Sequence, residues 1–66
     1  MNVGRSINIA MAKKDMRRPD LAKILGTTPQ NIKNLIDRDN TSTETLRKLA
    51  AIFGMSVSEF IRLGEE

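Results

Sequence analysis

Two carboxamide side chains, Gln30 and Asn34, stand four residues apart in a stretch that favours a helix. Residues at positions i and i+4 share one helix face, so both amides would point the same way. A carboxamide donates and accepts hydrogen bonds at once, which matches the edge that adenine presents in the major groove of DNA. The pair therefore predicts contact with bases. Polar residues that merely cover a solvated face would show the same spacing, and the adjacent Lys33 could reach a base, a phosphate or only solvent.

Two adjacent arginines, Arg17 and Arg18, stand at the expected start of the preceding helix. Cations there oppose the positive end of the helix dipole and cost about a few tenths of a kcal/mol unless an anion arrives. A DNA phosphate would be such an anion, and a harmless surface pair is the alternative. The wider set of residues expected to contact phosphates is polar or basic: Arg17, Arg18, Asn31, Arg38, Thr41, Ser42 and Thr43.

The segment that holds these residues predicts two short helices joined by a tight turn. Gly26 can adopt the left-handed backbone that ends a helix. Thr28 then offers a hydroxyl as N-cap, and Pro29 fits the first helical position, where a missing amide hydrogen is no loss. The expected helices cover residues 18–25 and 29–37. This arrangement is the helix-turn-helix, which presents its second helix to the major groove.

The rest of the chain predicts three more helices and no strand. The first covers about residues 2–14, with Ile7, Ala10, Met11 and Lys14 on one stripe and Gly4 weakening its first turn. Residues 38–42 are expected to form a polar loop in which Asn40 accepts a left-handed backbone. Capping boxes at Thr41 with Glu44 and at Ser56 with Glu59 predict a fourth helix that ends at Gly54 and a fifth that ends near Gly64. The expected fold is all-α, a compact five-helix bundle forming one domain over residues 1–66.

Composition narrows the function classes. The 66 residues include no cysteine and no histidine, so no catalytic or metal site and no cofactor is expected. Short apolar runs interrupted by charge argue against export or a membrane, and we expect a cytoplasmic protein without a small-molecule ligand. The net charge is +3, with eight basic against four acidic residues before position 41 and three against four after it. The positive charge thus accompanies the helix-turn-helix, as a nucleic-acid partner would favour.

The chain resembles the DNA-binding domain of the phage Cro and repressor family, a lambda-repressor-like fold. The residues that carry the resemblance extend over nearly the whole chain: Leu21-Ala22, Gly26-Thr27-Thr28, Gln30, Ile32, Leu35, Leu46, Leu49-Ala50, Phe53-Gly54 and Ser56 to Ile61. The resemblance implies a dimeric regulator that places its third helix in the major groove of double-stranded DNA. It also implies that the first turns of the second and fourth helices rest on phosphates.

Carried over residue by residue, the resemblance places Arg18 where the family commonly has a phosphate-contacting glutamine. It also places Thr28, Pro29, Gln30 and Asn34 where the family has its cap and its main base-contacting side chains. Lys33, which lies beside Gln30 and Asn34, completes the expected base contacts. Pro29 departs from the usual polar residue and offers only apolar contact, for example to a thymine methyl. Some members join the first and third helices by an ion pair; the matching residues here, Met11 and Ile36, predict a hydrophobic contact instead.

The last helix carries more apolar residues than one buried face requires. Phe60 is expected to pack under the first helix, which leaves Val57, Ile61 and Leu63 for a second subunit. Together these features predict a small Cro-like transcriptional regulator, a repressor of phage or prophage type that binds an inverted-repeat operator as a homodimer. The alternative is a protein-interaction module of the same fold, such as an antitoxin or adaptor, and catalysis has no supporting residues.

Overall fold

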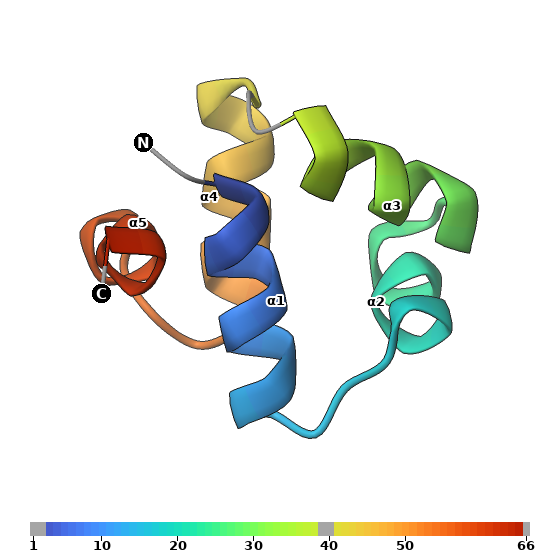
Figure 1. Cartoon of the computed structure of the whole chain (residues 1–66), viewed down its shortest axis with the longest axis horizontal. Helices are drawn as coiled ribbons and strands as arrows, with labels where there is room; N and C mark the ends of the chain where they lie inside the picture. Colours follow the sequence, from blue (N-terminus) through green and yellow to red (C-terminus); the bar gives the residue numbers. More distant parts are fainter. Residues whose placement is uncertain (1–2, 39–40, 66) are drawn as a thin grey trace.

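The computed structural model describes residues 3–38 and 41–65 and contains five helices (Figure 1). The helices are α1 (Val3–Lys13), α2 (Arg18–Leu25), α3 (Pro29–Arg38), α4 (Thr43–Ile52) and α5 (Val57–Glu65). The described Cα atoms span 25 × 22 × 19 Å. The all-α, five-helix prediction is confirmed. No helix within the described ranges is long and apolar enough to cross a membrane.

The hydrophobic core joins residues from all five helices. α1 lies between α5 on one side and the α2–α3 pair on the other (Figure 1). Buried side chains of α1, including Ile7, Ala10 and Met11, face this core as the helical spacing predicted, whereas Lys14 follows the helix and is exposed. Phe53 and Phe60 stack within the same core, with ring centroids 5.9 Å apart. Burial of this shared core, more than helix propensity, therefore holds five short helices together.

Helix boundaries follow local signals with three corrections. α3 continues through Arg38, which was expected in the loop. The N-cap of α4 is Ser42, not Thr41, because the Ser42 hydroxyl is the one that accepts from the Thr45 amide, at 3.3 Å. The third correction is the end of α1, which lies at Lys13 instead of residue 14. Asp15 follows with φ of 52°, a left-handed conformation that no sequence signal predicted. The expectation for Asn40 lies outside the described residues.

The cap of α5 agrees with the sequence. The Ser56 hydroxyl accepts from the Glu59 amide at 3.1 Å, as the capping-box spacing predicted, and the same hydroxyl donates to the Glu59 carboxylate at 3.2 Å. α5 then continues past Gly64 to Glu65.

The position of α5 decides which of its apolar residues stay accessible. Phe60 is buried, as expected. Leu63 retains only 8% of its surface, so the expectation that it is spare apolar surface is wrong in this chain. Val57 and Ile61 remain half-buried at the edge of the core. The surface of α5 that a second subunit could reach is therefore smaller than the sequence implied.

Candidate nucleic-acid interface

The turn between α2 and α3 fixes the direction of the third helix. Gly26 ends α2 with φ of 73° and ψ of 36°, the left-handed conformation that the sequence predicted. The amide of Thr27 donates to the Ala22 carbonyl at 2.8 Å, which closes the end of α2. The Thr28 hydroxyl accepts from the Asn31 amide at 3.2 Å and caps α3. Local hydrogen bonds thus define both sides of the turn.

The outward face of α3 carries the two predicted amides side by side. Gln30 and Asn34 are both exposed, and the Gln30 Nε2 donates to the Asn34 Oδ1 at 3.3 Å. This bond uses one of two Nε2 hydrogens, so Gln30 retains a hydrogen and its Oε1 for a ligand. A free donor and acceptor on one amide are what bidentate contact with adenine requires. Asn34 therefore orients Gln30 without exhausting its hydrogen-bonding capacity.

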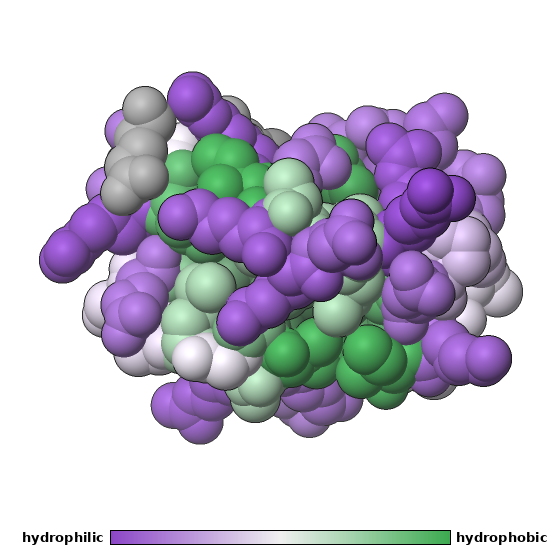
Figure 2. All heavy atoms as spheres, turned by 90° about the horizontal axis from the view of Figure 1, so that it is seen from below, coloured by the Kyte–Doolittle hydropathy of each residue, from purple (hydrophilic) through white to green (hydrophobic). Residues whose placement is uncertain are grey.

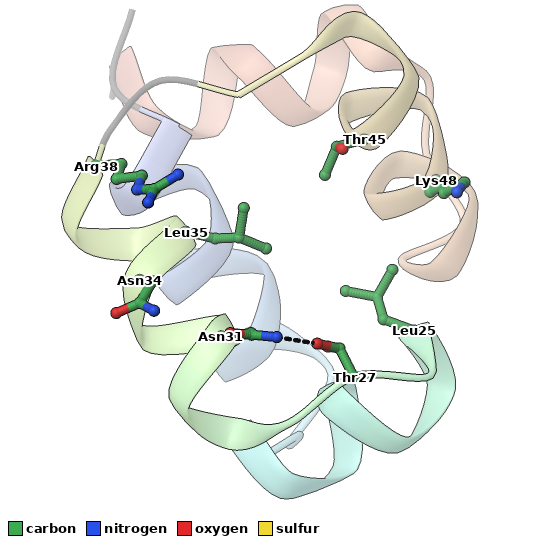
Figure 3. A pocket seen from close by; sticks show the side chains of 8 residues that line it. All are labelled: Leu25, Thr27, Asn31, Asn34, Leu35, Arg38, Thr45 and Lys48. Carbon is green, nitrogen blue, oxygen red and sulfur yellow. Dashed lines mark hydrogen bonds between the residues drawn. The ribbon is translucent and has the colours of Figure 1, made fainter.

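Asn31 has a different environment from its neighbours on α3. Its Nδ2 donates to the Thr27 hydroxyl at 2.7 Å, as the dashed line in Figure 3 marks. This contact directs the side chain back toward the turn and leaves the Oδ1 and one Nδ2 hydrogen for other partners. Asn31 therefore contributes to the rigidity of the turn, and its predicted phosphate contact would use only the remaining polar groups.

The basic residues expected on phosphates lie at helix ends. Arg17 and Arg18 are exposed at the start of α2, and within the described ranges neither forms an ion pair. The Asp20 carboxylate accepts from the Arg17 amide at 3.1 Å, which places an anion in the first turn and offsets part of the dipole conflict. Arg38 ends α3, and Ser42 and Thr43 are exposed at the start of α4. These groups therefore come from the start of α2, the end of α3 and the start of α4.

The hydroxyl of Thr41 is less accessible than that of its neighbours. Its Oγ1 is buried and has no hydrogen-bond partner among the residues that the structure describes. A buried hydroxyl without a partner is unfavourable by about 1–3 kcal/mol. The predicted phosphate contact from Thr41 would therefore require this oxygen to become exposed.

A pocket of about 330 Å³ lies between the α2–α3 turn, α3 and α4 (Figure 3). The sequence did not predict that the residues lining it would come together. Leu25, Leu35 and Thr45 project into it, and Asn34 lies on its outer margin (Figure 3). The complete lining is Leu25, Thr27, Asn31, Asn34, Leu35, Arg38, Thr45 and Lys48. Lys48 also approaches Glu44 at 3.7 Å in an exposed pair. Sequence spacing places Thr45 and Lys48 on one side of α4 but gives no sign that this side faces α3.

The surface near α2 includes one exposed large hydrophobic side chain. Seen from below, the molecule shows mostly hydrophilic residues with hydrophobic patches between them (Figure 2). Among the described large hydrophobic residues, Ile24 is the exposed one, at 57%. The helical spacing places Ile24 beside the buried stripe of α2 rather than on it.

Comparisons with known proteins agree with this geometry. Residues 6–66 match the model of the family described as Cro/C1-type HTH DNA-binding domain. A curated relative, the repressor protein CI of Enterobacteria phage phi80, is 32% identical over 56 residues. The aligned part covers 85% of this chain but 24% of the repressor, so the chain spans about a quarter of that relative's length. No solved structure matches the chain significantly. The family match over nearly the whole chain, together with the capped turn and the exposed face of α3, shows that this protein belongs to the Cro/C1-type helix-turn-helix DNA-binding domain family.

Proposed function

We propose that the chain binds double-stranded DNA in a sequence-specific way by inserting α3 into the major groove. The observation that carries this proposal is the Gln30–Asn34 pair, whose linked amides lie exposed on a helix that is fixed by the Thr28 cap. A rigid helix with outward amides suits contact with base edges, where geometry must be maintained closely. The exposed arginines at the start of α2 add charge for phosphates.

The proposed contacts divide into two groups. Gln30 and Asn34 contact bases by hydrogen bonds, Pro29 offers its ring to a thymine methyl, and Thr28 and Lys33 add contacts at the groove edge. The phosphate contacts are assigned to Arg17, Arg18, Asn31, Arg38, Thr41, Ser42 and Thr43. Phosphate contacts fix the position of a protein on DNA, whereas base contacts decide the sequence.

Binding by a homodimer completes this proposal. A single domain of this size buries little surface on DNA, and two domains related by a two-fold axis would place their α3 helices about 34 Å apart, one turn of DNA. The half-buried side chains of Val57 and Ile61 supply apolar surface for the contact between the two subunits. Leu63 adds little, because only 8% of its surface is exposed. Such a dimer would act in the cytoplasm as a small transcriptional repressor whose concentration sets operator occupancy.

The exposed Ile24 supports a second candidate function. A protein partner that covers this side chain, which is 57% exposed on α2, would make the chain an antitoxin or adaptor of the same fold. This alternative predicts no salt-dependent affinity for DNA, because no phosphates would be neutralised.

Selection of bound sequences from a random DNA pool, followed by gel-shift titration at several salt concentrations, tests both functions. DNA binding predicts an inverted-repeat consensus and an affinity that falls as salt rises. Failure to enrich any sequence, together with no binding of random DNA at low salt, would contradict the DNA-binding proposal and favour the protein partner.

A further inference from the structure

Gly4 lies where α1 crosses the last turn of α3. It is buried in the first turn of α1, and a Cβ built on it would collide with the carbonyl oxygen of Ile36. The same Cβ would lie 3.0 Å from the carbonyl carbon of Ile36 and 3.3 Å from its Cα. All three obstacles are backbone atoms, so no side-chain rotation relieves the collision. The two helices therefore approach this closely only because residue 4 has no side chain.

The sequence suggested a different role for this residue, a weak first turn of α1. Gly26 and Gly54 are the useful comparison, because a Cβ on either would meet nothing within 4 Å and both are glycine for their positive φ. Gly4 has no such backbone requirement and lies within a regular helix. Residue 4 is therefore glycine because α3 lies so close to it, not because its own backbone conformation requires glycine.

α1 is held more firmly at this crossing than α3. Val3, Ser6 and Ile7 are fully buried around Gly4, and the Ser6 hydroxyl donates to the Ile61 carbonyl in α5 at 3.3 Å. Among the residues of α3 that the structure describes, only Ile32 is buried. A side chain at position 4 would therefore displace the last turn of α3 more readily than the first turn of α1.

We propose that Gly4 is a positioning residue for the recognition of DNA sequence, because it sets the distance of the C-terminal end of α3 from α1. This inference rests on the proposed function. The N-terminal end of α3 is fixed by the Thr28 cap, so a displacement at Ile36 would tilt α3 about that end. Asn34, in the half of α3 nearer to Ile36, would move more than Gln30. Base contacts need closely maintained positions, whereas phosphate contacts from mobile arginines tolerate small shifts.

The test compares Gly4→Ala with wild type on the selected operator and on random DNA. We expect the ratio of the two affinities to fall about tenfold, the size of one weakened base contact, with the greatest loss of discrimination at the base affected by Asn34→Ala. A partly unfolded population lowers both affinities equally and leaves their ratio unchanged. If Gly4→Ala is unfolded in buffer, the ratio is measured in trimethylamine N-oxide, which favours the folded state.

The matched control is Ala12→Gly, which weakens the same helix at an exposed position without adding an atom. We expect this variant to keep the wild-type ratio. An unchanged ratio in Gly4→Ala, or an equal fall in Ala12→Gly, would overturn the positioning role.

An NMR measurement without DNA separates this inference from the proposed function. In Gly4→Ala, nuclear Overhauser contacts between α1 and the last turn of α3 should weaken, while those between α1 and α5 should persist. If the wild-type protein selects no DNA, the proposed function fails, and the role of Gly4 in DNA recognition fails with it. Weakened α1–α3 contacts in Gly4→Ala would still support the role of Gly4 in setting the distance between the two helices. Unchanged contacts would refute that role even if wild type does select DNA.

Discussion

The hydroxyl of Ser6 in α1 donates a hydrogen bond of 3.3 Å to the main-chain carbonyl of Ile61 in α5. Ser6 is fully buried, so a polar group lies inside the otherwise apolar contact between the first and last helices. Burying a hydroxyl is unfavourable unless it is hydrogen-bonded, and this bond to α5 forms in the register of the two helices that the structure shows. The Ser6–Ile61 contact therefore specifies how α5 docks.

Ser6→Ala should lower the free energy of unfolding by about 0.5–1.5 kcal/mol, the net value of one hydrogen bond. Ser6→Val should lower the free energy of unfolding further, because residue 6 has no accessible surface and the larger valine side chain must displace its neighbours. Urea denaturation measures both, with the exposed Ser58→Ala in α5 as control. A Ser6→Val variant as stable as wild type would show that the space around residue 6 is not closely packed.

Gln30→Ala should weaken binding to the selected operator by about 1–3 kcal/mol and affect random DNA much less, because it removes a base contact. Arg18→Ala should weaken both about equally and reduce the salt slope by about one unit, since it removes a phosphate contact. Gel-shift titrations at three or more salt concentrations separate the two effects. Equal losses on both DNAs for Gln30→Ala would exclude it from contact with bases.

Gly26→Ala and Gly54→Ala should each reduce stability by about 1–2 kcal/mol. Both glycines have positive φ, 73° and 68°, and a Cβ at either position meets open space, so the cost is conformational in both cases. Asparagine adopts the left-handed region more readily than alanine, so Gly26→Asn should lose less stability than Gly26→Ala. Thermal and urea unfolding provide the comparison. A stable Gly26→Ala would mean that the turn adopts another backbone path.

Ile61→Glu and Leu63→Glu should separate the dimer contact from the core. Ile61 is half-buried, so its charged variant should remain folded as a monomer while DNA affinity falls and depends more steeply on protein concentration. Leu63 is only 8% exposed, so Leu63→Glu should bury a charge and unfold the chain. Circular dichroism and sedimentation with and without DNA measure the outcomes.

The exposed Arg62→Ala serves as the control for a surface change on the same helix. An Ile61→Glu variant that retains dimers on DNA, or a selected site without inverted symmetry, would refute the proposed dimer contact.

The contact between Met11 and Ile36 stays a prediction. Met11 is buried in the core and Ile36 packs against the same core, which is compatible with the expected hydrophobic replacement of an ion pair. The backbone of Ile36 lies against Gly4, about two helical turns before Met11.

The five helices and the turn could be predicted from the sequence, because the signals that define them act between near neighbours. Gly26 ends α2, Thr28 caps α3 and Ser56 caps α5 through bonds to residues only three to four positions away, so local chemistry was sufficient. The shared face of Gln30 and Asn34 follows equally from helix geometry. The N-cap of α4 was harder to predict, because Thr41, Ser42 and Thr43 are consecutive residues with hydroxyl groups and each could cap the helix.

The surfaces that meet in the folded protein could not be predicted in the same way. The closeness of Gly4 to Ile36, the Ser6–Ile61 bond and the burial of Leu63 all join segments that are distant in the chain. Helical periodicity tells which residues share a face, but it carries no information about which helix covers that face. That choice depends on packing five helices together into one core, where shape and the pairing of buried polar groups select among the faces available.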